Sequence, residues 1–204
     1  MRRIVLVGQK ALASPDFLLD DLAGTSGRLD VLVRALRASL LVSHGLRADV
    51  IAYLVLQGGP RAPRSVRFQG ERARFLRPEE RSLATLLKKV LAAPEPEVDD
   101  AAFGEVRQGI AVARGGLGAV LADAGTGPLY VLEEGAPDVR SVPIEPAATF
   151  VFGDHLGFDP PARSALQAAG AMPLGLGPVS VHVEDAVAIL MNELDRRGAP
   201  PSPR

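Results

Sequence analysis

The chain has 204 residues, of which 47% are apolar and 23% charged, a size and composition typical of one globular domain that needs no disulfide or metal for stability. It contains no cysteine, so disulfides and thiolate metal sites are excluded. No apolar run is long enough for a signal peptide or a membrane span, so we expect a cytoplasmic protein without a membrane partner. The net charge of −1, taken over the whole chain, argues against a nucleic-acid partner. The arginines are nevertheless concentrated in residues 61–81, and their guanidinium groups suit phosphate contacts.

The first elements are a strand, a loop and a helix. A short apolar run predicts a strand at 3–7, and the turn-rich segment 14–27 predicts a loop. Leucine and valine recur at helical spacing over 28–42, and Thr25 or Ser26 can cap the first turn of that helix.

The middle of the chain continues the alternation. A β-branched run predicts a buried strand at 48–56, and an alternating pattern predicts a half-exposed strand at 64–68. An amphipathic helix is expected at 78–93, with its lysines late as the helix dipole prefers. Residues 93–104 are expected to form a surface excursion.

The C-terminal half repeats the pattern with shorter elements. We expect, in order, a strand at 109–113, a helix at 115–125, strands at 129–132 and 149–152, a helix at 161–169, a strand at 172–176 and a helix at 181–197. Strands and helices that alternate in this way predict an α/β domain with a mostly parallel sheet flanked by helices. We place this single domain at residues 1–198, followed by a disordered tail at 199–204.

Three polar loops follow predicted strands. The run FVFGDHLGF (150–158) stops at two glycines that bracket an acid and a histidine, GLG (175–177) follows the strand at 172–176, and VLEEGAP (131–137) follows the strand at 129–132. Ligands of parallel sheets bind beyond the carboxyl ends of strands, so these loops predict a site for a flat heteroaromatic ligand held by backbone groups.

Other sites are disfavoured by motif. The three histidines, His44, His155 and His182, have no metal-ligand spacing, so no metal is expected. GxGxxG between a strand and a helix, the P-loop and GxSxG are all missing, which weakens a nicotinamide or nucleotide enzyme and a serine hydrolase.

Several segments together resemble a known family. SGRLDVLVRAL, SHGLRADV, YLVLQG, FVFGDHLG and LGPVSVH occur in order over about residues 3–196 and resemble the archaeal-type tRNA pseudouridine-54 N1-methyltransferases of the SPOUT superfamily. The resemblance implies a trefoil knot at the C-terminal end, a homodimer, S-adenosylmethionine as methyl donor and tRNA as substrate. The apolar face of the last helix, with Val187, Ile189, Leu190 and Met191, agrees with a symmetric dimer.

The resemblance also implies the site residues. It places the methyl donor, held largely by backbone groups, against Leu132, Gly153, Asp154, His155, Gly157, Leu176, Gly177, Pro178, Val179, Ser180, Val181 and Ala186. At the last of these positions many relatives have a cysteine, which puts the identity of the RNA substrate in question rather than donor binding.

Candidates for the chemistry lie in GRLD and GDH. Pseudouridine N1–H is weakly acidic, so a carboxylate can accept its proton, and Asp30 is the first candidate base and Asp154 the second. The alternative role of Asp30 is a first-turn acid that stabilises the helix dipole. Arg28 can hold a uracil oxygen or a phosphate.

Five further arginines are candidates for RNA phosphate contacts, with solvated surface as their alternative: Arg47, Arg61, Arg64, Arg67 and Arg72. The rival to the enzyme is a SPOUT-fold protein that binds RNA or S-adenosylmethionine without methyl transfer.

Overall fold

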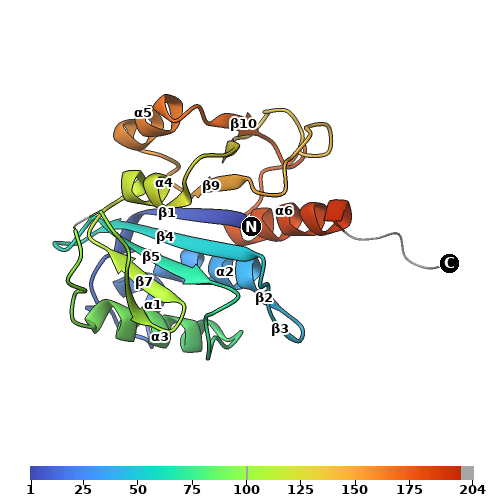
Figure 1. Cartoon of the computed structure of the whole chain (residues 1–204). Coiled ribbons are helices and arrows are strands. Elements are labelled where there is room, and N and C mark those ends of the chain that lie inside the picture. The colour runs from blue at the N-terminus through green and yellow to red at the C-terminus, as the bar shows by residue number, and fades with distance from the viewer. Residues whose placement is uncertain (100, 199–204) are drawn as a thin grey trace.

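Helices cover both faces of a central eight-stranded sheet in the computed structural model, which describes residues 1–99 and 101–198 (Figure 1). The strands are β1 Arg2–Leu12, β2 Leu41–Val42, β3 Gly45–Leu46, β4 Val50–Gly58, β5 Arg64–Gln69, β6 Gly104–Arg107, β7 Ile110–Ala113, β8 Leu129–Leu132, β9 Thr149–Gly153 and β10 Met172–Leu174. The helices are α1 Leu22–Thr25, α2 Leu29–Leu40, α3 Glu80–Ala92, α4 Leu117–Ala124, α5 Pro160–Ala168 and α6 Val183–Gly198.

The sheet is parallel in one half and antiparallel in the other. Its order is β10-β8-β9-β1-β4-β5-β7-β6, and the first five strands pair in parallel while the last three join in antiparallel fashion. The expected α/β fold with a mostly parallel sheet is therefore confirmed. The antiparallel extension was not anticipated, because apolar periodicity marks a strand without giving its partner or direction.

The buried strands have apolar side chains on both faces. In β1, Ile4 and Leu6 belong to the cluster that includes the apolar residues of α2, α3 and α6. Val5 and Val7 belong to the second cluster, with side chains from α4 and α5. A strand covered on both faces needs a continuous apolar run, which is why this segment of the sequence does not alternate.

Most expected elements are present, with small shifts at their ends. The predicted loop at 14–27 contains the one-turn helix α1, and the β2–β3 hairpin and β6 were missed because each has only two to four residues. The predicted tail at 199–204 lies outside the described residues. In the described ranges, no helix is both long and apolar enough to cross a membrane.

The apolar face of α6 does not support a dimer in the way the sequence suggested. Val187, Leu190 and Met191 are buried within the chain, where α6 packs against α2. Of the four residues considered, only Ile189 is exposed. The extra apolar character of the last helix is thus explained by packing inside one subunit.

Candidate functional site

The carboxyl ends of β1, β4, β8, β9 and β10 lie at one edge of the sheet, because these strands are parallel. The loops that follow β8, β9 and β10 are neighbours there, since the three strands are adjacent in the sheet. The three polar loops therefore lie at the same end of the sheet, as the sequence predicted. We call this side of the molecule the catalytic edge.

The loop after β9 is organised by a buried carboxylate. Asp154 is buried, and its Oδ2 and Oδ1 accept hydrogen bonds from the backbone N–H of Gln9 (2.8 Å) and Leu156 (2.9 Å). The Gln9 side chain donates to the carbonyl of Gly157 at 3.1 Å. Adding a Cβ to Gly153 would bring it within 3.0 Å of the Gly157 backbone. This loop is therefore a tight, internally bonded turn.

The loop after β10 is held by backbone hydrogen bonds at its first residue, whereas the backbone of the residues that follow is not hydrogen bonded. Gly175 forms a bridge with Asp138 and exchanges backbone hydrogen bonds of 2.8 Å with Pro137 and Val139. Ser180 Oγ donates to Glu134 at 2.5 Å. Among the described residues, the N–H and C=O groups of 176–181 make no backbone hydrogen bond.

Free backbone groups beside exposed apolar side chains fit an adenosine-containing donor. Gly177 has φ +128°, and a Cβ built on it would point into open space. Val179 is 73% exposed, and Val181 and Leu156 are also exposed. Unpaired amides can bind the polar edge of a base while these side chains cover its faces. Of the predicted donor residues, His155 and Pro178 are also exposed, while Leu132, Leu176 and Ala186 are half-buried.

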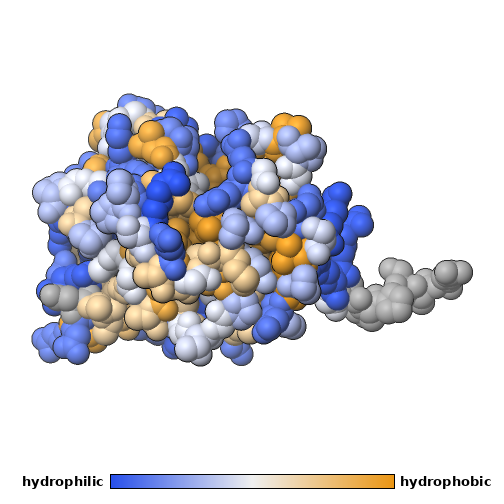
Figure 2. Space-filling model, turned by 90° about the horizontal axis from the view of Figure 1, so that it is seen from above, coloured by the Kyte–Doolittle hydropathy of each residue, from blue (hydrophilic) through white to orange (hydrophobic). Residues whose placement is uncertain are grey.

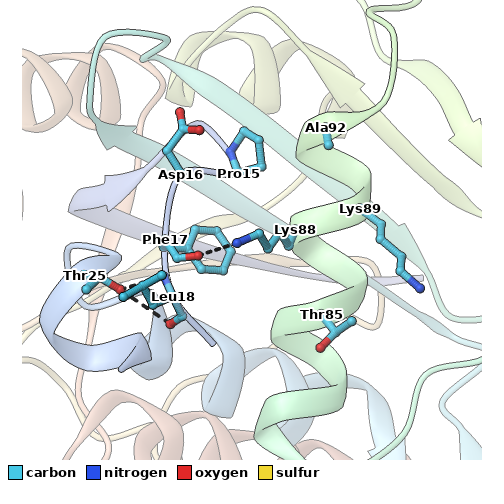
Figure 3. A pocket seen from close by; sticks show the side chains of 9 residues that line it. All are labelled: Pro15, Asp16, Phe17, Leu18, Thr25, Thr85, Lys88, Lys89 and Ala92. Atoms are coloured by element: carbon cyan, nitrogen blue, oxygen red, sulfur yellow. Dashed lines mark hydrogen bonds between the residues drawn. The ribbon is translucent and has the colours of Figure 1, made fainter. Parts of the chain in front are cut away.

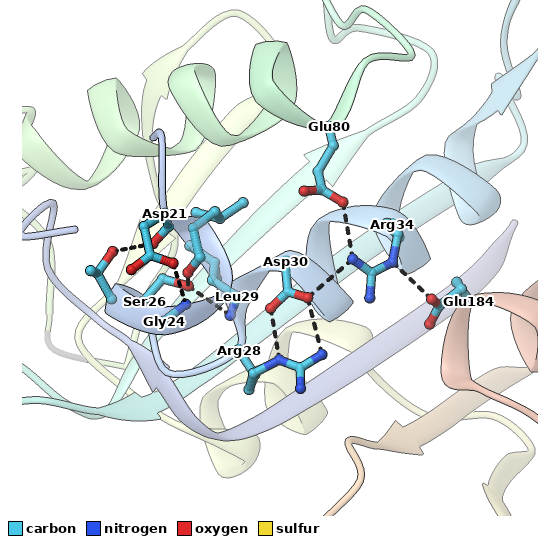
Figure 4. Close-up of polar contacts among 11 residues, drawn as sticks. Asp21, Gly24, Ser26, Arg28, Leu29, Asp30, Arg34, Glu80 and Glu184 are labelled. Carbon is cyan, nitrogen blue, oxygen red and sulfur yellow. Dashed lines mark hydrogen bonds and ion pairs between the residues drawn. The ribbon is translucent and has the colours of Figure 1, made fainter. Parts of the chain in front are cut away.

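The GRLD segment starts α2 through a strained turn. Gly27 and Arg28 both have left-handed backbone angles, with φ of 65° and 69°, which is unusual for arginine. Ser26 Oγ accepts a hydrogen bond of 3.0 Å from the N–H of Leu29 in the first turn of α2, but the N-cap position itself is Arg28, which makes no side-chain cap bond (Figure 4). A Cβ on Gly27 would lie 1.8 Å from the carbonyl oxygen of Lys10, so only glycine allows this close approach to β1.

This turn holds Arg28 against Asp30. Arg28 Nε and Nη2 donate to the two oxygens of Asp30 at 3.0 and 3.1 Å, and Arg34 Nη1 donates to Oδ2 at 3.0 Å (Figure 4). The side chain of Asp30 is 5% exposed, whereas that of Arg28 is 47% exposed. The pair therefore presents a buried carboxylate behind a solvent-facing guanidinium.

The ionisation of Asp30 is set by these two cations. Burial alone would raise the pKa of Asp30, but hydrogen bonds from Arg28 and then Arg34 outweigh it and hold the pKa below its usual value. The hydrogen bond to Asp30 in turn raises the pKa of Arg28. Asp30 is thus an anion at neutral pH.

The two candidate bases differ in what remains free. A carboxylate has about four lone-pair sites, of which Asp30 uses three, so one acceptor site remains. Both oxygens of Asp154 accept backbone N–H groups that shape its loop, so moving this side chain would disrupt the turn. By the same count Asp154 keeps two acceptor sites, so what distinguishes Asp30 is the exposed Arg28 cation beside it.

The predicted RNA-binding arginines do not form one surface. Arg61 is exposed just beyond the carboxyl end of β4, at the catalytic edge. Arg47 pairs with Asp195 at 2.7 Å and lies, like Arg72, at the opposite edge. Arg67, on β5, pairs with Asp123 at 2.6 Å and lies over the ring of Phe103.

The prediction that Arg64 binds RNA is wrong, because this residue is buried. Its side chain is 2% exposed, and Nη1 donates to the carbonyls of Ala13 (3.2 Å) and Leu91 (3.1 Å). Burial lowers its pKa, and the guanidinium has no route to an RNA phosphate. An alternating strand pattern gave no sign that this polar residue faces the interior.

Some residues at the edge were missed from the sequence. Gln9 joins the β9 loop to β1, and Gln57 Nε2 donates to Gln9 Oε1 at 3.2 Å. Arg34 binds Asp30 and also Glu184, which lies in the first turn of α6. The acidic start of the last helix was a usable signal for Glu184, but Arg34 looked like ordinary helix surface.

A groove on the α3 side contains none of the predicted site residues. It has a volume of about 740 Å³ and lies between the 15–18 loop and α3 (Figure 3). Lys88 Nζ donates to the carbonyl of Phe17 at 2.5 Å and lies over its ring. In the part of the chain that the structure describes, no group of three or more His, Cys, Asp or Glu side chains could hold a metal.

Known proteins match the chain along almost its whole length. A family model described as SAM-dependent RNA methyltransferase matches residues 1–199. The tRNA (pseudouridine(54)-N(1))-methyltransferase of Methanocella arvoryzae is 37% identical over 197 residues, covering 97% of this chain and 100% of that protein. The protein of the same name from Methanosarcina acetivorans is 38% identical over 202 residues, covering 98% and 93%.

A solved structure shares the fold. Archaeoglobus fulgidus Nep1 bound to S-adenosylhomocysteine superposes with a TM-score of 0.62, covers 97% of this chain and 99% of that one, and is 14% identical. At that identity the likeness concerns the fold alone.

Proposed function

Because the chain belongs to the family of SAM-dependent RNA methyltransferases, we propose that it methylates N1 of pseudouridine 54 in the T arm of tRNA. One observation carries the assignment of the site. Arg34 links Asp30 at 3.0 Å to Glu184 at 2.8 Å, which places the candidate base beside the first turn of α6. Since residues 176–182 lead directly into that turn, donor loop and base lie at the same edge.

The residues divide the reaction between binding and proton transfer. S-adenosylmethionine, when bound, supplies an electrophilic methyl group on a sulfonium. The free backbone groups of 176–181 would hold the donor, and Gly153 would line the same site. Arg28 holds a uracil oxygen or a phosphate, and Asp30 accepts the proton that leaves N1 as the N1–carbon bond forms and the carbon–sulfur bond breaks.

Phosphate contacts are assigned to the cations of the catalytic edge. Arg61 and Arg28 are exposed there, and Lys10, at the carboxyl end of β1, is exposed as well. A tRNA bound to this edge would bring its backbone to these side chains. We therefore retain Arg61 from the predicted set and add Lys10.

The larger assembly is part of the same proposal. We propose one domain over residues 1–198, a homodimer, a cytoplasmic location with the tRNA, and a C-terminal trefoil knot. Gly175 contacts the loop 133–148, and Arg197 donates to the carbonyls of Val139 and Val142 in that loop. The chain thus packs against one loop both before and along α6.

The test uses two versions of one tRNA. In pseudouridine the ribose is attached to carbon and N1 carries a proton, whereas in uridine N1 is attached to the ribose. A tRNA with pseudouridine at position 54 is expected to accept a methyl group, and the same tRNA with uridine is expected to accept none. Equal methylation of both would overturn N1 as the target atom. Tight donor binding without transfer to either would favour the binding-protein alternative.

A further inference from the structure

Arg34 contacts carboxylates from three different helices. Nη1 donates to Asp30 Oδ2 in α2 and to Glu80 Oε2 in α3, both at 3.0 Å, and Nε donates to Glu184 Oε1 in α6 at 2.8 Å (Figure 4). In the described ranges, Glu80 and Glu184 have no other ion-pair partner. Arg34 is therefore the common cation of this group.

The three ion pairs of Arg34, which we call its arms, differ in how far their carboxylates are exposed to solvent. Glu80 is the most exposed of the three carboxylates, whereas Asp30 is almost fully buried and Glu184 is 20% exposed. Glu184 Oε2 is buried without a hydrogen-bond partner in the described ranges. The hydrogen bond from Arg34 to Oε1 is therefore the one that compensates the burial of this carboxylate. The inner arms, to Asp30 and Glu184, carry most of the electrostatic interaction because they are shielded from solvent.

The inner arms join the two halves of the proposed site. Asp30 is the proposed base, and Glu184 begins the helix that follows the free loop 176–182. We infer that Arg34 is a positioning residue, an inference that rests on the proposed function. It holds the Asp30 carboxylate and the start of α6 in one fixed arrangement, and the donor loop is held with the start of α6. A planar guanidinium can bind two carboxylates in different directions at once, which a lysine ammonium does less well.

The charges around Asp30 make this role measurable. Asp30 faces Arg28 on its own helix end and Arg34 one turn later, while Glu80 from α3 and Glu184 from α6 reach it only through Arg34. Burial would lower the pKa of Arg34, but its hydrogen bonds to Glu184, Glu80 and Asp30 outweigh burial and raise that pKa, so this residue stays a cation. Loss of its charge leaves burial opposed by Arg28 alone.

The experiment is a carbon-13 NMR titration of the Asp30 carboxyl, combined with calorimetry of S-adenosylhomocysteine and with tRNA methylation. In Arg34→Gln the Asp30 midpoint should rise above that of the wild type, and donor affinity and turnover should each fall about tenfold, the size of one hydrogen bond to a charged group. Arg34→Lys should restore the midpoint and leave turnover low. Arg37→Gln, an exposed arginine on the same helix, should change none of these.

Each outcome separates the role of Arg34 from the proposed function. An unmoved midpoint in Arg34→Gln, or full turnover in Arg34→Lys, overturns the positioning role. If Arg34→Gln fails to fold, Glu184→Gln is the second variant, because it removes only the ion pair between Arg34 and α6. It should weaken donor binding without raising the midpoint of the Asp30 titration. Unchanged donor affinity in Glu184→Gln also overturns the inference. Wild-type protein that methylates no tRNA overturns the proposed function instead, because the titration and calorimetry need no turnover.

Discussion

Asp30 is held by arginines and yet keeps one acceptor site. Its two oxygens accept three hydrogen bonds from Arg28 and Arg34, and its side chain is almost fully buried. A first-turn acid can stabilise the helix dipole from an exposed position, so that role alone does not require such enclosure. The enclosure holds the Asp30 carboxylate in one orientation, as its proposed role as base requires.

Replacing Asp30 by asparagine tests this role. Asp30→Asn keeps the shape of the side chain and removes its basicity, so turnover should fall roughly a hundredfold. Donor affinity should not change, because Arg34 keeps its hydrogen bond to Glu184 at the start of α6. Single-turnover methylation and calorimetry measure the two quantities. Full activity in this variant would move the search to Asp154 or to a transfer without a protein base.

Gly177 provides the matching test of donor binding. Its φ of +128° is strained for any other residue, and a Cβ there would enter the open space beside the loop. Gly177→Val should therefore lower affinity for S-adenosylhomocysteine at least about tenfold, on the scale of 1.4 kcal/mol per factor of ten. Gly118→Val, in the exposed part of α4 where a Cβ also meets nothing, is the control and should bind normally. Equal affinity in both variants would place the donor elsewhere.

At the scale of elements, the sequence predicted most of the fold. Helix α2 and strand β9 were placed within two residues, because leucine spacing, a Ser26 cap and a glycine stop are local signals. The buried Arg64 and the junction of three helices at Arg34 were not predictable, since they depend on which elements pack together. The free loop 176–181 was located only through family resemblance, as no periodicity marks it.

Ion pairs join α6 to β1 at the edge of the sheet opposite the site. Arg2 and Arg47 both donate to Asp195 at 2.7 Å, and Arg2 also contacts the carbonyl of Leu194. Hydrogen bonds from Arg2 and Arg47 outweigh burial and lower the pKa of Asp195. Since this carboxylate is 41% exposed, solvent screening limits its contribution to stability.

Asp195→Asn should lower the free energy of unfolding by up to about 1 kcal/mol at pH 7. A pKa that is lower in the folded state stabilises the protein above the unfolded-state pKa, and this contribution is lost as pH falls through the folded-state pKa. The difference between wild type and variant should therefore shrink below about pH 4. Urea unfolding at several pH values measures it, with the exposed Glu71→Gln as control. A difference that grows towards low pH would contradict the assignment.

At the scale of the whole molecule, four of the exposed apolar side chains belong to the parallel half of the sheet and its loops. Met172 on the edge strand β10, Val179 and Val181 in the free loop, and Leu156 after β9 are all exposed. The face seen from the side of α5 and β10 shows several separate apolar areas between hydrophilic ones (Figure 2). One bound donor is too small to cover side chains on two loops and a strand.

A second copy of the chain is the occupant that we propose for this surface, and solution mass tests it. Light scattering should give about twice the monomer mass of 21.4 kDa at micromolar concentration. Because α6 buries its apolar face inside the subunit, a charge at Met172 should disturb the dimer more than a charge elsewhere. Met172→Asp should shift the mass towards the monomer, whereas Leu18→Asp, at an exposed apolar site beside α3, should leave the dimer intact. A wild-type monomer at all concentrations would remove the dimer and leave the donor loop as the only explanation for these exposed side chains.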